Sequence, residues 1–251
     1  MDIKQIFLSD LLQLISIMRE PSAAVIDLSP IVKGIDVTHC RTFYDFAQAF
    51  YSKVIYHFST NKIIDLIVDR YFRNSLKENV RDERGMGTRL LFDDITILPS
   101  KFQVDFLKNS ENKDDLGRYL AKKIIEFHLN QNLVLVVTYE HTILSSDIAI
   151  LDEESIVNCT SEDADQRLIR HVLNLTHQTN YSDILVCTYD TDVLMLLIGY
   201  SPYLEKLKQI NLVCQFGFGN NKKFFSINDI AKNIGYDISK ALPFFSCLFR
   251  M

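Results

Sequence analysis

The sequence lacks the excess of positive charge that marks many nucleic-acid-binding proteins. It has 27 Lys and Arg against 32 Asp and Glu, and its formal net charge is −5. A protein that grips nucleic acid over a broad face needs clustered Lys and Arg to neutralise the phosphates. Any contact with nucleic acid is therefore expected to be local.

Cysteine motifs and long apolar runs are also missing. The five cysteines form no CxxC pair and no Cys/His cluster at zinc spacing, and an odd number of cysteines suits free thiols in a reducing compartment. Segment 1–22 has apolar residues at helical spacing but is interrupted by charges, which predicts a helical extension and not a signal peptide or membrane span. We therefore expect an intracellular protein, cytoplasmic or nuclear, that binds no zinc and no membrane.

A glycine-rich phosphate loop is absent as well. Gly217-Phe218-Gly219 comes nearest, but it lacks the third glycine and the Gly-Lys-Ser/Thr signature. His171 and His177 lie six residues apart on a predicted helix and do not share a face, so we interpret them as surface histidines. Tyr139-Glu140-His141 follows a predicted strand and is interpreted as a loop, where such residues often collect.

Short apolar runs alternate along the chain with longer stretches of helical period. The predicted strands are 24–28, 63–68, 133–138, 184–187 and 211–216, and the predicted helices are 42–58, 116–130, 161–179, 192–198 and 227–234. This alternation predicts a three-layer α/β/α fold with a mainly parallel central sheet. The length of 251 residues favours a single domain over 1–251, with 73–112 as a long irregular insertion.

Carboxylates stand at the ends of three predicted strands. Asp27 lies near the end of the first, Asp69 directly after the second, and Asp190 and Asp192 directly after the fourth. Open α/β sheets bind ligands beyond the carboxyl ends of their strands, and grouped carboxylates repel one another unless cations neutralise them. Oxygen ligands favour Mg²⁺ or Mn²⁺, and two such ions roughly 4 Å apart assist phosphodiester hydrolysis. The pattern therefore predicts metal-assisted phosphoryl cleavage.

Each of these residues also has an ordinary structural interpretation. An Asp after a strand is a common turn or N-cap residue, and Ser161-Glu162-Asp163 is an ordinary start for a helix. It is the convergence of several carboxylates, with Asp165 in the same helix start, that favours a metal site.

Several short motifs follow one another along the chain. They are Ala-Val-Ile-Asp at 24–27, Val-Asp-Arg-Tyr-Phe at 68–72 with Ser-Leu-Lys at 75–77, Arg-Asp-Glu-Arg-Gly at 81–85, Glu-Asp-Ala-Asp-Gln-Arg at 162–167 and Thr-Tyr-Asp-Thr-Asp-Val at 188–193. In this order they resemble the PIN-like superfamily, in its flap-endonuclease-like branch of uncharacterised metazoan proteins. The two late motifs are the most specific, and the match covers nearly the whole chain.

The resemblance implies roles for individual residues. The metal-binding positions correspond to Asp27, Asp69, Asp163, Asp165, Asp190 and Asp192, with Glu162 an alternative to Asp163, and the catalytic ones to Asp69, Asp165, Asp190 and Asp192. The basic residues that contact the substrate phosphate correspond to Lys77, Arg81 and Arg84. Their spacing places Lys77 and Arg81 on one helical face, which suits a phosphate or, equally, a solvated face paired with neighbouring acids.

The sequence departs from this family near its end. In that branch a segment like Ala-Leu-Pro-Phe-Phe at 241–245 continues into Thr-Gly-Cys-Asp, which supplies a further carboxylate, whereas here it continues Ser-Cys-Leu-Phe-Arg-Met and resembles a truncated product. We therefore expect a nuclease that cleaves DNA or RNA and that uses two divalent ions, Mg²⁺ or Mn²⁺. The alternative is an inactive PIN-like module that binds nucleic acid or protein.

A third interpretation takes Asp190-Thr191-Asp192-Val193 as the nucleophile motif of a haloacid-dehalogenase-like phosphatase, which also has Asp-x-Asp after a strand. Those enzymes need a later Lys and a further acidic pair after their core strands. Few residues follow here that could supply them. The resemblance to these phosphatases therefore rests on the Asp-x-Asp spacing alone.

Overall fold

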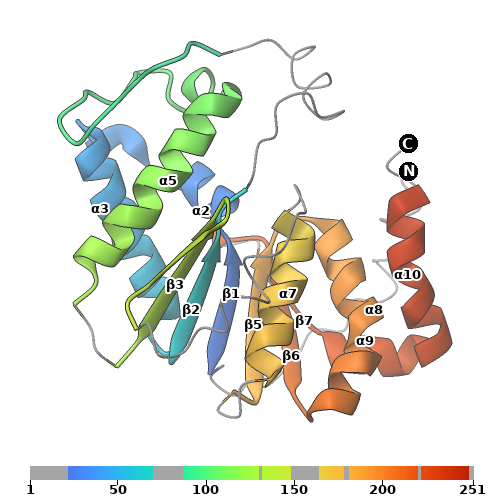
Figure 1. The fold of residues 1–251 in the computed structure, drawn as a ribbon. Coiled ribbons are helices and arrows are strands. Elements are labelled where there is room, and N and C mark those ends of the chain that lie inside the picture. Colours follow the sequence, from blue (N-terminus) through green and yellow to red (C-terminus); the bar gives the residue numbers. More distant parts are fainter. Residues whose placement is uncertain are drawn as a thin grey trace. The chain divides into compact units, whose positions relative to one another are not determined.

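A computed structural model gives the fold of the chain (Figure 1). It describes residues 22–69, 87–129, 132–147, 164–177, 181–219 and 222–248. Within these ranges seven strands, most of them parallel, are flanked by helices. The α/β class predicted from the sequence is thus confirmed, and the arrangement is consistent with a three-layer α/β/α fold. No helix in the described part of the chain is long and apolar enough to cross a membrane.

The chain divides into two compact units. Unit 1 combines Met1–Ile26 with Asp165–Met251, and unit 2 is Asp27–Ala164. The chain therefore leaves unit 1 at the end of its first strand, forms unit 2, and returns at the start of a helix.

The described part of unit 2 contains three strands in the order β4-β3-β2. β2 (Ile63–Ile67) pairs in parallel with β3 (Val134–Tyr139), which pairs antiparallel with β4 (Thr142–Ser145). Its described helices are α2 (Leu28–Lys33), α3 (Phe43–Phe58) and α5 (Ser110–Phe127), with short 3₁₀ turns at Val37–His39 and Phe106–Lys108. α5 packs against both α3 and β3.

Aromatic side chains fill the core of unit 2. Phe43 stacks on Phe92 with ring centroids 3.9 Å apart, and Phe102 stacks on Phe106 at 5.0 Å. α3 begins at Phe43 because Thr42 and Asp45 form a capping box, in which each side chain accepts a hydrogen bond from the other residue's backbone N–H. The box and the buried rings together hold the start of α3 against the irregular segment that contains Phe92.

Among the described residues of unit 1 there are four strands in the order β1-β5-β6-β7. β1 (Ala23–Asp27), β5 (Asp183–Thr188) and β6 (Asn211–Phe216) are parallel, and β7 (Lys223–Ser226) is antiparallel to β6. The helices described in this unit are α7 (Ala164–His177), α8 (Thr191–Leu207), α9 (Ile227–Ile234) and α10 (Tyr236–Leu248). The last three pack on one another (Figure 1).

Several predicted boundaries need correction. The helix predicted over 192–198 runs on to Leu207 with Pro202 inside it. The helix predicted to start at 116 begins at Ser110, because the side chain of Asn109 accepts the backbone N–H of Asn112 and caps it. The predicted insertion 73–112 is therefore irregular only over 87–105 of its described part, and the 3₁₀ turn and the start of α5 follow. Residues 73–86 of this insertion lie outside the described residues, as does the predicted helical extension 1–22 except for Ser22.

Candidate functional site

Ser29 joins two of the predicted metal ligands in unit 2. Asp27 ends β1, and its Oδ1 accepts the backbone N–H of Ser29 at 3.0 Å, which caps α2. The Ser29 hydroxyl donates to Oδ2 of Asp69 at 2.9 Å, two residues beyond the end of β2. Asp27 and Asp69 are thus held by one residue, and both are half-buried. The sequence analysis did not single out Ser29, although Asp-x-Ser after a strand is a recognisable capping pattern.

A small cavity lies beside Asp69. Its volume is ≈ 30 Å³, enough for about one or two water molecules. Leu28, Val32, Val68 and Leu116 are among its apolar walls, and its polar lining is Ser29, Lys33, Asp69 and Lys113. Residues with carboxylate, hydroxyl and amino side chains therefore line a space that fits only a very small ligand or part of a larger one.

Gly117 on α5 permits this packing. A Cβ on Gly117 would lie 2.3 Å from Cγ1 of Val68, the residue before Asp69. Only glycine lets α5 approach the end of β2 this closely. The sequence signal available was a glycine inside a helical pattern, which often marks a close approach of two backbones.

The two aspartates after β5 in unit 1 have unequal environments. Asp190 is exposed and caps α8, its Oδ1 accepting the backbone N–H of Asp192 at 2.8 Å. The backbone N–H of Asp190 itself donates to the Thr188 hydroxyl at 3.0 Å. Asp192 lies in the first turn of α8 and is 7% exposed. Both carboxylates therefore stand where the positive end of the helix dipole stabilises negative charge.

α7 supplies Asp165 and two buried residues that the sequence analysis did not predict as such. Asp165 is half-buried in the first turn. Arg167 and His171 are each 1% exposed, whereas His177 is exposed. The prediction of surface histidines was thus wrong for His171, because His171, Val172 and Leu175 lie on the helix face that packs inward.

Some predicted residues lie outside the described part of the chain. They are Glu162, Asp163, Lys77, Arg81 and Arg84. Another acidic residue is buried and was missed: Asp65, in the middle of β2, is 2% exposed. A single Asp within an otherwise apolar strand does not show from the sequence that its side chain is buried.

The predicted ligands are divided between the two compact units. Asp27 and Asp69 belong to unit 2, and Asp165, Asp190 and Asp192 belong to unit 1. Among the described residues, no three His, Cys, Asp or Glu side chains are grouped so that they could hold a metal ion. A single centre that combines the carboxylates of both units stays a prediction.

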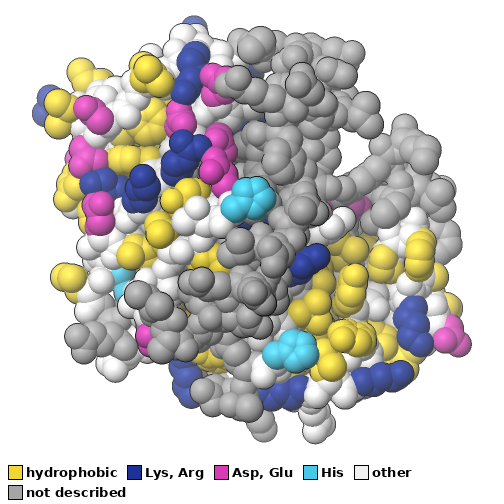
Figure 2. All heavy atoms as spheres, viewed as in Figure 1, with side chains coloured by type: hydrophobic (Ala, Val, Ile, Leu, Met, Phe, Trp, Pro, Cys, Tyr) yellow, Lys and Arg dark blue, Asp and Glu magenta, His cyan; other side chains and the backbone are white. Residues whose placement is uncertain are grey.

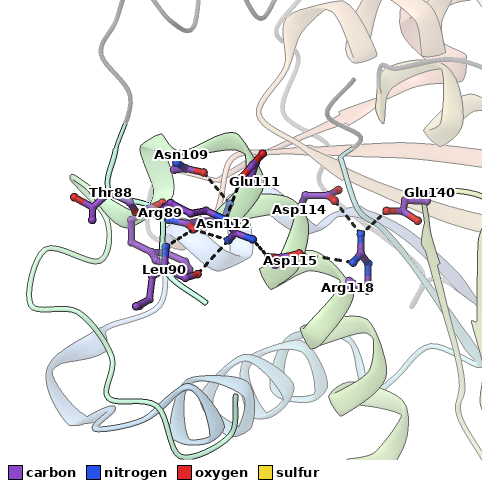
Figure 3. A network of polar contacts seen from close by, with 11 residues as sticks. Thr88, Arg89, Leu90, Asn109, Glu111, Asn112, Asp114, Asp115, Arg118 and Glu140 are labelled. Atoms are coloured by element: carbon purple, nitrogen blue, oxygen red, sulfur yellow. Dashed lines mark hydrogen bonds and ion pairs between the residues drawn. The ribbon is translucent and has the colours of Figure 1, made fainter. Parts of the chain in front are cut away.

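A polar network fixes the N-terminal part of α5 and the turn between β3 and β4 (Figure 3). Arg118 donates to Asp114 at 3.1 Å and to Glu140 at 2.6 Å. Glu140 adopts a φ of +46°, which a non-glycine residue rarely adopts, and its contact with Arg118 helps to hold that turn. Burial raises the pKa of Asp114, and the nearby Glu140 carboxylate raises it further.

Charges of both signs lie side by side on this part of unit 2. Over α5, Figure 2 shows Lys and Arg side chains interspersed with Asp and Glu. Lys123, for example, contacts Asp94 and Glu126 at 2.8 and 2.9 Å. Over the described residues of α5, positive charges are therefore paired with neighbouring acids and not gathered into a basic patch.

Neither a scan against protein-family models nor a search of curated proteins returned a match for this chain. The PIN-like assignment therefore stays a prediction from the sequence motifs.

Proposed function

We propose that the chain is a divalent-metal-dependent nuclease of the PIN-like type that hydrolyses phosphodiester bonds in DNA or RNA. The observation that carries the proposal is the hydrogen-bonded set Asp27–Ser29–Asp69. It holds two carboxylates at the carboxyl ends of strands, where α/β folds bind their ligands.

The side chains of this set fit a hard cation. Asp27 and Asp69 offer carboxylate oxygens, the ligands that Mg²⁺ and Mn²⁺ prefer. Ser29 orients one oxygen of each carboxylate by a hydrogen bond. Residues that hydrogen-bond to metal ligands commonly orient them in this way. A bound divalent ion would activate water and stabilise charge on the phosphate.

Asp190 and Asp192 are proposed to supply the carboxylates of unit 1. The hydrogen bond from the Asp192 backbone to Asp190 Oδ1 sets the orientation of the Asp190 side chain. The Asp190 carboxylate is exposed and can be reached by an ion from solvent, whereas Asp192 is buried. In unit 2, Lys33 and Lys113 line the cavity beside Asp69 and offer positive charge to a phosphate oxygen.

A second function is supported by the same contacts. Asp27 caps α2 and Asp190 caps α8, and capping by itself is a sufficient structural reason for an Asp at each position. A PIN-like module that binds nucleic acid or protein without cleaving it would keep both caps.

The test is Mn²⁺-dependent cleavage of labelled single-stranded and 5′-flap DNA and RNA. We expect cleavage by the unmodified chain and none by Asp190→Asn/Asp192→Asn. Asp229→Asn is the matched control, because Asp229 is an exposed aspartate in the first turn of α9. Ser29→Ala should lower cleavage roughly 10- to 100-fold, and Ser29→Thr, which keeps a hydroxyl, should retain more of it.

The outcomes separate the two functions. Cleavage that disappears with the double substitution but survives Asp229→Asn supports the nuclease. Absence of cleavage by the unmodified chain, in a preparation with a cooperative unfolding transition, contradicts the nuclease and favours the non-catalytic module.

A further inference from the structure

A pair of aromatic rings, one of them exposed, lies in unit 1 next to Asp190. Tyr189 follows β5 and Phe218 follows β6, and their ring centroids are 5.4 Å apart with an interplanar angle of 31°. Tyr189 is 51% exposed, and Phe218 is half-buried. Large aromatic rings that remain exposed beside a candidate site are common binding elements.

The strand register places the two rings together. β5 and β6 are paired in parallel up to Thr188↔Phe216, so the residues that follow leave the sheet at the same end. The backbone N–H of Gly217 donates to the carbonyl of Thr188 at 2.9 Å. Gly217 has a φ of +86°, which lets the chain turn immediately after β6.

A hydrogen bond then fixes Tyr189 in place. The backbone N–H of Phe218 donates to the Tyr189 phenolic oxygen at 3.1 Å. The tyrosine ring is thereby ordered before any ligand arrives, so less conformational entropy is lost on binding. A pre-ordered, exposed and flat apolar surface is the requirement for stacking a base.

Positive charge lies at the start of the neighbouring strand. Lys223 pairs with Phe216 in the β6–β7 ladder, and Lys222 precedes it. Both are exposed, and Lys222 Nζ is 5.6 Å from the centroid of Phe224. In a chain of net charge −5, these lysines place local positive charge at the end of the ladder from which Phe218 follows.

We propose that Tyr189 and Phe218 form a stacking platform for a base of single-stranded nucleic acid, with Lys222 and Lys223 contacting the adjoining phosphate. The inference rests on the proposed nuclease function and specifies its substrate as an unpaired strand. In duplex nucleic acid the base faces are already stacked, whereas an unpaired base has a free face. Stacking is tolerant of sequence, so the platform would select strandedness and not a base.

The test measures binding without cleavage. Fluorescence anisotropy in EDTA compares a short fluorescein-labelled single strand with an abasic strand of the same length, which keeps the phosphates and lacks the bases. The unmodified chain should bind the base-bearing strand roughly tenfold more tightly. Tyr189→Ala should bind both strands alike, while Tyr189→Phe, which keeps the ring, should retain most of the preference.

Tyr203→Ala is the matched control, because Tyr203 on α8 is also 51% exposed; it should keep the full preference. Equal binding of the two strands by the unmodified chain, or an unchanged preference in Tyr189→Ala, overturns the platform. The outcome is separate from that of the cleavage assay. Base-dependent binding without Mn²⁺-dependent cleavage would refute the nuclease and keep the platform, and cleavage without base-dependent binding would do the reverse.

Discussion

Replacement of Asn112 by alanine should destabilise unit 2 more than its single polar side chain suggests. Asn112 is 0% exposed. Its Nδ2 donates to the carbonyls of Thr88 and Phe106 at 2.8 and 3.0 Å, and its Oδ1 accepts the backbone N–H of Leu90 at 3.0 Å and Nη1 of Arg89 at 2.9 Å (Figure 3). One side chain therefore ties the irregular segment 87–90 to the first turn of α5.

The expected loss of stability follows from these four hydrogen bonds. Each contributes a net 0.5–1.5 kcal/mol, and a buried group left without a partner costs about 1–3 kcal/mol. The Arg89 bond counts least, because Arg89 also pairs with Glu111 and Asp115. Alanine regains about 0.5 kcal/mol of helix propensity. We expect Asn112→Ala to lower the free energy of unfolding by about 3 kcal/mol.

Urea unfolding followed by circular dichroism measures this change, and hydrogen exchange adds a local measurement. The Leu90 amide, which donates to Asn112, should lose protection in the variant. Asn211→Ala is the control, because the exposed side chain of Asn211 donates a hydrogen bond to Asp183 at 3.1 Å; the substitution should change the free energy of unfolding by less than about 0.5 kcal/mol. A loss below about 1 kcal/mol in Asn112→Ala, with Leu90 still protected, would refute the argument.

Two further predictions follow from the packing and the charges. In Gly199→Ala, the new Cβ would lie 2.4 Å from Cγ of Pro243 on α10. This overlap should outweigh the gain in helix propensity and destabilise unit 1 by about 1–2 kcal/mol. In a double-mutant cycle, the same substitution should cost less stability in a Pro243→Ala background. Asp114→Asn should stabilise the protein at neutral pH. The raised pKa of Asp114 means that ionisation of this carboxyl opposes folding. The gain should therefore fade as the pH falls through the raised pKa toward the ordinary pKa of Asp, and it should be absent below that ordinary value, where the carboxyl is protonated in both states. A variant less stable than the parent at neutral pH would contradict the sign.

Local patterns in the sequence predicted the elements that depend on neighbouring residues. The strand at 211–216 and the helix at 227–234 were predicted with the bounds observed for β6 and α9. Apolar runs and a helical period are properties of contiguous residues, so they are readable without the fold. Short elements such as β4 and β7 were missed, because four residues of a strand stabilised by its partner carry little pattern of their own.

For the candidate site, the sequence predicted which residues would carry the chemistry but not which contacts hold them. The positions of Asp27, Asp69, Asp190 and Asp192 after strands followed from the strand pattern alone. The hydrogen bond from Ser29 to Asp69 joins residues 40 apart, and the one from Phe218 to Tyr189 joins residues 29 apart. Contacts of that kind arise only when strands pair in a particular register.

Burial separates the two levels in the same way. The helical spacing of apolar residues predicts that α7 has a face that packs inward. The tertiary packing decided that Arg167 and His171 lie on that face, each 1% exposed. The sequence by itself thus determined the α/β class, most strands and the carboxylates at their ends, because these depend on local alternation of apolar and polar residues. Only the tertiary structure decided that Ser29 joins two of those carboxylates and that Tyr189 meets Phe218, because strand register and close packing bring together residues that are distant in the chain.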